Sequence, residues 1–557
     1  MQVSTVSGVR LNTSPAVEAF LFDFGKVATA YEYDWAKQES YARRAAYLSD
    51  GGFAGDRAGL ADVLERYNRA LGAGEAALAG VERLRDPQAL AVVTGQQAGI
   101  FTGPAYAIYK AMTAIHLARR QEELLGVPVV PVFWIAGEDH DWQEVSWVLA
   151  PSGDGTVRIA LRESFDGDRH SVGMAPAPES LGEVIDELVG LLPETEFKAL
   201  VAERIRSAAA APPALEPAAT MGRPTLADWF GRLMAWLFDG TGLIFVCAND
   251  PGIRRLEADF FGRAIERFEQ VDEAFAAGIA RWEGLGYKPT VERQLGSLNL
   301  FTYVRGDRLP LVGAGDHVWV RDRAEIGWSR GELLHRAATH PALFSTNVVL
   351  RPVIQGAVFP DLAYVGGPGE VAYWGLLRDV FGAMGQQMPV VVPRESYTLV
   401  EPPVARILEK QGMSVADGFF RMAEKRQELL EREDRLGIPQ LFTQFRAEFG
   451  ERYEALADVL QNLDSSLKFV TEENRKQIAV QISKLEEKAK QQHRKNCEVG
   501  LKQFDRLSAQ LSPAGGLQER VVTILPYVAK YGPDLVRRLV DEVAPDETGW
   551  SHRAIFL

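Results

Sequence analysis

The stretch PVFWIAGEDHDWQE, residues 131–144, joins an apolar segment to a cluster of charges. Its first six residues are apolar and aromatic, which is typical of a strand buried on both faces of a parallel sheet. Four ionisable residues then stand side by side: Glu138, Asp139, His140 and Asp141. Such groups are costly at the end of a core strand unless they bind something, so we interpret all four as catalytic candidates. A helix N-cap near Trp142 would account for only one of the carboxylates.

Strands and helices alternate on both sides of this stretch. The apolar run LAVVT (90–94) predicts a strand, and a helix follows it, with Pro104 in its first turn and Gly126 just past its end. Further strands are expected in GLIFVCANDPG (242–252) and in MPVVVPRESYTLV (388–400). A strand, a helix and a second buried strand form the βαβ unit of a parallel sheet. The sequence therefore predicts an α/β core.

Two segments depart from this alternation. Ala, Pro and Glu dominate between about 151 and 228, where we expect a helical insertion. Residues 290–340 contain alternating runs such as LNLFTYV and HVWVRD, which predict an insertion containing β-strands. The core is expected over residues 1–400, a helical coiled-coil arm over 401–512, and a segment that returns to the core over 513–557.

The predicted arm carries a heptad pattern. Its apolar positions are Phe449, Leu456, Leu463 and Val470, seven residues apart, with Tyr453, Leu460 and Leu467 four residues after the first three. This is the a/d seam of a coiled coil, and NLDSS (462–466) is the expected turn. Apolar positions continue along the second helix beyond the length of the first helix, so we expect a homodimer closed through the arm.

Composition bounds the class of protein. The chain has 557 residues, 46% hydrophobic and 24% charged, with a formal net charge of −14, which argues against broad binding to nucleic acids or anionic membranes. No apolar run approaches the ~20 residues needed to span a bilayer. Cys247 and Cys497 are too few for a disulfide framework and fit a reducing compartment. Because the sequence also shows no signal-peptide pattern, we expect a cytoplasmic protein.

Two glycine-bearing segments complete the candidate site. TGQQAGIFTGPAYAIYK (94–110) and YVGGPGE (364–370) each follow a strand and lead into a helix through a Gly-Pro pair. Glycines and helix amino ends let a backbone approach anionic ligands closely. Lys110 could instead be solvated. The nucleotide-binding candidates are Gly95, Gly99, Gly103, Gly366, Gly367 and Gly369. The substrate-binding candidates are Gln96, Gln97, Tyr106, Lys110, Arg351, Gln355, Tyr364, Glu370, Tyr373, Trp374 and Arg394.

Several long motifs together resemble the bacillithiol biosynthesis cysteine-ligase family. They are VVTGQQAGIFTGPAYAIYK, PVFWIAGEDHDWQEV, RPVIQ, FPDLAYVGGPGEVAYW, VVPRESYTL and LQERVVTILPYVAKYG, and they run from the first core strand to the tail. The resemblance implies a Rossmann-like core with inserted connecting segments and a dimerising coiled coil. It also implies a ligase that joins cysteine to glucosaminyl-malate, the last step of bacillithiol biosynthesis.

Amide formation requires an activated carboxylate, so ATP or ADP is the expected cofactor and Mg²⁺ is a further option. Glu138, Asp139 or His140 would deprotonate the attacking amine, and Arg351 or Arg394 would bind malate carboxylates. The sequence contains no H-x-G-H or K-M-S-K-S stretch, the usual adenylate-forming signature of this fold. Two alternatives stay open: a nucleotidylyl- or other group transferase on the same fold, and a metal-dependent hydrolase centred on Asp139, His140 and Asp141.

Overall fold

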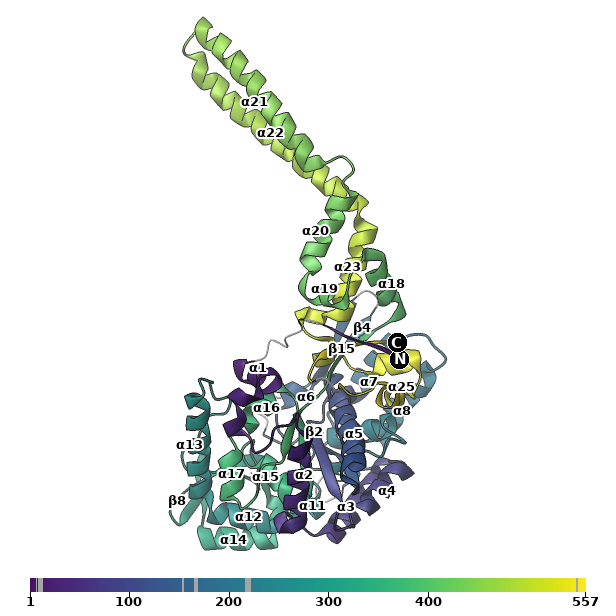
Figure 1. Cartoon of the computed structure of the whole chain (residues 1–557), viewed down its shortest axis with the longest axis vertical. Coiled ribbons are helices and arrows are strands. Elements are labelled where there is room, and N and C mark those ends of the chain that lie inside the picture. Colours follow the sequence, from purple (N-terminus) through teal and green to yellow (C-terminus); the bar gives the residue numbers. More distant parts are fainter. Residues whose placement is uncertain (7, 9–13, 153–154, 165–168, 216–221, 547–548) are drawn as a thin grey trace. The chain divides into compact units, whose positions relative to one another are not determined.

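The centre of the protein is a five-stranded parallel sheet. A computed structural model describes residues 1–6, 8, 14–152, 155–164, 169–215, 222–546 and 549–557. The strand order is β13-β12-β2-β3-β6, and every neighbouring pair is parallel. The strands are β2 (Leu90–Gln96), β3 (Val129–Ile135), β6 (Ile244–Cys247), β12 (Asp361–Gly366) and β13 (Val390–Pro393). The α/β prediction is confirmed, and the PVFWI run belongs to β3, an interior strand between β6 and β2, the strand labelled in Figure 1.

Helices cover both faces of this sheet because its strands are apolar on both sides. β3 is buried at every position, and its side chains divide between two large apolar clusters. The principal crossover helix is α5 (Tyr106–Leu125), which ends at Gly126 in a left-handed conformation, φ 68°. The amino-terminal helices are α1 (Pro15–Phe22), α2 (Gln38–Tyr47), α3 (Arg57–Leu71) and α4 (Glu75–Arg83). α5 begins two residues after the predicted Pro104, because a 3₁₀ turn (Ile100–Thr102) precedes it.

The segment between β3 and β6 contains both strands and helices. Its helices are α6 (Trp142–Val145), α7 (Leu181–Leu191), α8 (Lys198–Ala210) and α10 (Leu226–Leu237). An antiparallel pair, β4 (Trp147–Ser152) and β5 (Gly155–Ala160), precedes the longer helices. The sequence predicted helices over this segment and did not predict that pair of strands.

A second sheet, antiparallel throughout, forms over residues 297–346. Its order is β10-β9-β8-β7-β11. The strands are β7 (Ser297–Val304), β8 (Asp307–Ala314), β9 (His317–Val320), β10 (Arg323–Ser329) and β11 (Phe344–Thr346). The flanking helices are α11 (Pro251–Leu256), α12 (Ala258–Glu266), α13 (Phe268–Gly284) and α14 (Arg330–Thr339). The segment RPVIQ begins helix α15 (Arg351–Val358), with Pro352 in its first turn.

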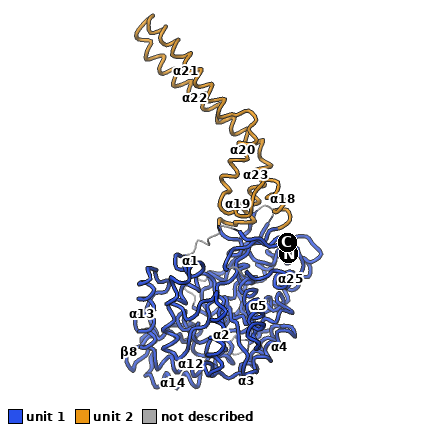
Figure 2. Tube along the Cα trace, viewed as in Figure 1, with its two compact units in different colours: residues 1–400, 516–557 blue, residues 401–515 orange. Residues whose placement is uncertain are grey.

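The chain's two ends meet in a three-stranded sheet. β15 (His552–Phe556) pairs in parallel with β14 (Ser396–Val400) and antiparallel with β1 (Gln2–Thr5). The remaining helices of this unit are α16 (Pro368–Trp374), α17 (Arg378–Ala383), α24 (Leu525–Tyr531) and α25 (Leu535–Glu542). Residues 1–400 and 516–557 thus form one compact unit (Figure 2).

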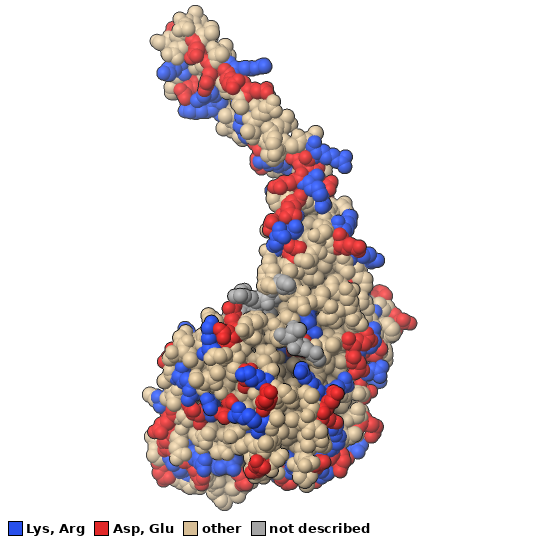
Figure 3. Space-filling model, in the orientation of Figure 1, with Lys and Arg blue, Asp and Glu red and all other residues tan. Residues whose placement is uncertain are grey.

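The second unit, residues 401–515, is helical (Figure 2). Its helices are α18 (Pro402–Gln411), α19 (Val415–Phe420), α20 (Met422–Glu433), α21 (Ile438–Leu463), α22 (Leu467–Asn496) and α23 (Glu498–Leu511). α21 and α22 run side by side, and the Tyr453 hydroxyl donates to the Thr471 carbonyl at 3.0 Å. Across the described residues, no helix is long and apolar enough to cross a membrane. Basic and acidic side chains are interspersed over the face in Figure 3.

Candidate functional site

A cavity of about 880 Å³ lies in the first unit, beyond the carboxyl ends of β2, β3 and β12. This is where parallel α/β sheets place their ligands. Residues of the antiparallel sheet and of α13 also line it. Of the sequence candidates, the cavity wall contains Gly95, Gln96, Gln97, Tyr106, Lys110, Glu138, Asp139, Arg351, Tyr364, Gly367, Gly369, Glu370, Tyr373 and Arg394. Seven described candidates are not part of this wall: Gly99, Gly103, His140, Asp141, Gln355, Gly366 and Trp374.

Each member of the charged cluster has a structural partner. Glu138 forms a buried ion pair with Arg254. The Oδ1 atom of Asp139 accepts the backbone N–H groups of His140 at 2.7 Å and Asp141 at 3.2 Å. Asp141 is the N-cap of α6, as the alternative interpretation proposed for one carboxylate. The cluster is therefore partly architectural, and only Glu138 and Asp139 line the cavity.

His140 is held by an arginine from the antiparallel sheet. Arg308, on β8, lies 3.2 Å from His140 Nδ1 and also donates to Ser345 Oγ at 2.9 Å and the Thr346 carbonyl at 2.6 Å. Burial and the Arg308 charge lower the pKa of His140, so the imidazole is neutral at neutral pH. Because Arg308 has only donors, Nδ1 is the acceptor and the ring proton is on Nε2. Nδ1 is thus already occupied, which disfavours His140 as the general base.

Lys110 is a buried cation paired with a partly buried carboxylate. Its side chain is 1% exposed, and its Nζ lies 2.5 Å from Glu370 Oε2 and also donates to the Gly95 carbonyl. Burial opposes ionisation of Glu370, yet the Lys110 ammonium and hydrogen bonds from Tyr364 and Gly367 hold its pKa below the usual value. The alternative of a solvated Lys110 is wrong. The pair joins α5 to the capping box of α16.

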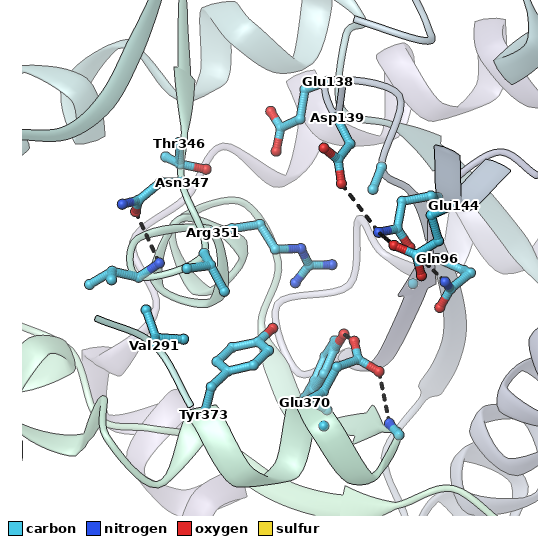
Figure 4. A pocket seen from close by; sticks show the side chains of 18 of the residues that line it. Gln96, Glu138, Asp139, Glu144, Val291, Thr346, Asn347, Arg351, Glu370 and Tyr373 are labelled. Carbon is cyan, nitrogen blue, oxygen red and sulfur yellow. Dashed lines mark hydrogen bonds between the residues drawn. The ribbon is translucent and has the colours of Figure 1, made fainter. Parts of the chain in front are cut away.

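The two glutamines of TGQQAG organise the acidic side of the cavity. Gln97 Nε2 donates to Glu144 Oε2 at 2.8 Å and to Asp139 Oδ2 at 3.2 Å. Gln96 donates to Gln97 Oε1 at 2.6 Å and to the Tyr106 hydroxyl at 3.0 Å. Desolvation and the Asp141 and Asp139 carboxylates raise the pKa of Glu144. Two carboxylates therefore stand together at the cavity wall, steadied by a single amide (Figure 4).

Arg394 is tied to the chain's tail. It pairs with Glu519 at 2.6 Å, and Glu519 also accepts from Ser396 Oγ and the Tyr397 N–H, both at 2.9 Å. Both side chains of the pair are buried. The LQER motif thus fixes β14 and the arginine before it. Since its charge is already neutralised, Arg394 suits an architectural role better than recognition of malate.

Several residues on or behind this wall were missed by sequence reasoning. Glu144 lies within the stretch 131–144, so it could have been predicted from the sequence. Arg308 and Arg254 could not, because they lie 168 and 116 residues along the chain from their partners His140 and Glu138. Asn299 has a left-handed φ of 58° inside β7 and accepts from Asn347 Nδ2 at 2.8 Å. A non-glycine residue in that region is uncommon and concentrates at functional sites.

The glycines have mainly packing roles. A Cβ on Gly95 would lie 2.6 Å from the Trp134 carbonyl oxygen and 2.9 Å from Arg351 Nη2, so no larger residue fits without displacement. Gly103 has φ 69°, which favours glycine. Among the described residues, no three His, Cys, Asp or Glu side chains converge as metal ligands would.

The comparisons with known proteins agree with this geometry. Residues 1–395 match the family model described as "Bacillithiol biosynthesis BshC, N-terminal Rossmann-like domain", and residues 397–557 match "Bacillithiol biosynthesis BshC, C-terminal coiled-coil domain". The chain belongs to the bacillithiol biosynthesis BshC family. The Rossmann-like core and the coiled-coil arm are thereby confirmed.

Curated members of the family match along their whole length. A protein of Symbiobacterium thermophilum is 62% identical over 558 residues, covering 100% of both chains. Proteins of Desulforamulus reducens and Geobacillus kaustophilus are each 34% identical, covering 98% and 92% of both chains. All three carry the name "Putative cysteine ligase BshC". These names support the ligase hypothesis rather than the transferase or hydrolase alternatives.

Proposed function

We propose that this protein joins the carboxyl group of cysteine to the amine of glucosaminyl-malate, the last step of bacillithiol biosynthesis. The family and the names of its curated members support cysteine ligation. The observation that carries the proposal is a cavity whose wall contains both carboxylates and guanidinium groups that form no ion pair with a described residue. Such a wall suits two substrates that together contribute amines and carboxylates.

The acidic side of the cavity is the proposed binding place of the sugar amine. Asp139 and Glu144 share the Gln97 amide, and the raised pKa of Glu144 suits a group that takes up a proton. An ammonium group must lose its proton before the nitrogen can form a bond to the carboxyl carbon. Glu144 is therefore the favoured base, with Asp139 beside it to attract the incoming cation.

Two arginines of the wall are the proposed binding place of substrate carboxylates. Arg351 and Arg520 line the cavity, and neither forms an ion pair with a carboxylate of any described residue. Arg520 is exposed at the wall, which suits the larger substrate and its malate group. Asn299 and Asn347, also on the wall, offer hydrogen bonds of the kind that sugar hydroxyls use.

Activation of the cysteine carboxylate is the part of the reaction that ATP with Mg²⁺ would supply when bound. The cavity volume lies within the usual range of cofactor sites, roughly 300–1,000 Å³. Gly367 and Gly369 are on its wall, but the Gly367 N–H already donates to Glu370 at 2.8 Å. The glycine candidates thus suit phosphate binding only in part.

The function is tested by product formation and by the cell's thiols. We expect the purified protein, given ATP, Mg²⁺, cysteine and glucosaminyl-malate, to produce the amide detected by mass spectrometry. Deleting the gene should remove bacillithiol and accumulate glucosaminyl-malate. A deletion strain that keeps its bacillithiol would refute the proposal. We place the reaction in the cytoplasm, where the two free cysteines, Cys247 and Cys497, remain reduced.

We further propose that the arm forms a homodimer. The pairing of α21 with α22 half-buries Tyr453, Leu460 and Leu467, the d positions of the heptads. It leaves the a positions Leu456, Leu463 and Val470 exposed by 52%, 79% and 58%. An apolar row of this kind costs about 25 cal/mol for each Å² left in water, and a second copy would cover it.

Light scattering on point variants tests the dimer without removing the arm. Leu456→Glu and Leu463→Glu place charges on the exposed apolar row, so we expect a shift from dimer to monomer at micromolar concentration. Gln461→Glu, on the same helix but outside that row, is the matched control and should stay dimeric. A monomeric wild-type protein, or dimers that survive both leucine changes, would contradict the proposal.

A further inference from the structure

Arg351 lines the cavity with a guanidinium group that has no carboxylate partner among the described residues. Its guanidinium is held between the rings of Trp134 and Tyr364, each 5.3 Å from its central carbon, and donates to Gln355 Oε1 at 3.1 Å. It forms no ion pair within the described part of the chain. Figure 4 shows the group pointing into the cavity. The ring contacts fix its plane, so a carboxylate ligand would meet a preoriented donor.

Glu138 presents the complementary charge. Its side chain is buried, 4% of the residue being exposed, and its Oε2 atom pairs with Arg254. Its Oε1 atom accepts no hydrogen bond from a described residue, and Glu138 lines the cavity. The view in Figure 4 shows its carboxylate directed into the same space as Arg351. One oxygen is thus anchored and the other is available to a ligand.

Arg254 anchors this carboxylate from behind the cavity wall. It is buried in α11 and pairs on its other side with Glu257 at 2.6 Å. A buried charge is stabilised by an ion-pair partner of this kind. Arg254 is therefore a positioning residue that holds the Glu138 carboxylate in place at the cavity wall.

We propose that Glu138 and Arg351 together bind the zwitterion of an α-amino acid, with the ammonium on Glu138 and the carboxylate on Arg351. The two side chains form no ion pair with each other, so both charges remain available to one ligand. In an α-amino acid an ammonium and a carboxylate are attached to the same carbon, which matches two opposite charges facing one space. On the proposed function, on which this assignment of the ligand rests, the amino acid is cysteine.

The depth of the pair favours the smaller substrate. Glu138 is nearly inaccessible and follows the end of β3, whereas the exposed Arg520 remains for the malate carboxylates. Glucosaminyl-malate also contains an amine and carboxylates, and it is the competing occupant. The experiment must therefore separate these two ligands.

Binding of truncated ligands to the full-length protein tests the proposal. L-cysteine carries both charges, cysteamine lacks the carboxylate, and 3-mercaptopropionate lacks the ammonium. We expect the wild-type protein to bind L-cysteine roughly tenfold or more tighter than either analogue, since each lost charged hydrogen bond removes about that factor. Isothermal titration calorimetry under a non-thiol reductant measures the three affinities.

Two variants should give a crossed pattern. Glu138→Gln weakens L-cysteine and cysteamine but leaves 3-mercaptopropionate unchanged. Arg351→Gln weakens L-cysteine and 3-mercaptopropionate but leaves cysteamine unchanged. Arg520→Gln, an arginine change on the same wall, should weaken glucosaminyl-malate alone. The wild-type ligand series keeps the test decisive if Glu138→Gln fails to fold.

Equal binding of all three thiols to the wild-type protein would overturn the inference. So would variants that lose glucosaminyl-malate while keeping L-cysteine, because the pair would then belong to the other substrate. L-alanine and L-serine separate this inference from the proposed function. If the wild-type protein binds them and both Glu138→Gln and Arg351→Gln weaken that binding, but no ligation of cysteine is found, the zwitterion site stands and the ligase proposal fails.

Discussion

Replacing Lys110 by methionine would remove one charge of the buried pair and keep most of the side chain's apolar stem. Glu370 then lacks its 2.5 Å contact with the ammonium, and the Gly95 carbonyl lacks the hydrogen bond that it accepts from Lys110. Breaking a buried ion pair from one side costs about 3–5 kcal/mol. Glu370 is 26% exposed and keeps donors at Tyr364 Oη (2.5 Å) and Gly367 N (2.8 Å), so we expect the low end, about 3 kcal/mol.

A double-mutant cycle separates the ion pair from packing. Glu370→Gln leaves Lys110 without its carboxylate, and the double variant leaves no unpaired charge. We expect the double variant to be at least about 2 kcal/mol more stable than the sum of the two single-variant losses in unfolding free energy would predict. Burial already lowers the pKa of Lys110, and loss of Glu370 lowers it further. Glu370→Gln should therefore regain stability as the pH rises toward the usual lysine pKa.

Tryptophan fluorescence during urea unfolding is the appropriate assay. All 11 tryptophans lie within residues 1–400 and 516–557, so the signal reports the unit that contains the cavity and not the helical arm. Lys488→Met, an exposed lysine in the arm, is the control for the loss of a charge and should leave this transition unchanged. A loss below about 1 kcal/mol for Lys110→Met, or strictly additive losses, would refute the reasoning.

Three further outcomes follow from the site. Burial raises the pKa of Glu257 to about 7 despite Arg254, so the stability that the protonated group contributes is lost as the pH rises from about 4.5 through 7. Relative to Glu257→Gln, the wild type should lose up to about 3 kcal/mol of unfolding free energy across that window. Parallel pH–stability curves for the two proteins would contradict this. Gly95→Ala brings a Cβ to 2.6 Å from a backbone oxygen and should lower the free energy of urea unfolding by about 1–3 kcal/mol. Gly369→Ala is the control, because its Cβ would have no atom within 4 Å, and it should leave stability almost unchanged. Equal losses of stability in the two variants would count against the packing role of Gly95. Arg308→Gln should raise the pKa of His140 in an NMR titration, because the lowering charge is gone, and an unchanged value would count against this electrostatic account.

The sheet could be predicted because its strands are locally recognisable. Runs such as PVFWI are short, apolar and followed by polar loops, and alternation with helices requires parallel connections. The pair β4 and β5 was missed because its sequence, WVLAPS and GTVRIA, is interrupted by Pro151 and only partly buried.

Charge pairing could not be predicted, because the partners come together only in the folded protein. Lys110 and Glu370 are 260 residues apart, and Arg394 and Glu519 are 125 apart. The sequence contains these side chains, but nothing in the residues around Lys110 distinguishes an exposed lysine from a buried one. Placing Lys110 required the position of α16, which depends on the complete fold.

The charged cluster at the end of β3 shows how this limit affects functional assignment. Read alone, four ionisable residues in succession suggest four catalytic groups. In the folded protein Asp141 caps a helix, and Asp139 accepts hydrogen bonds from the following backbone and from Gln97. His140 contacts Arg308. What remains available is one oxygen of Glu138, whose other oxygen pairs with Arg254, an arginine that the local sequence does not contain. The polar atoms that folding leaves without a protein partner, rather than the density of charges in the sequence, therefore identify where a substrate can bind.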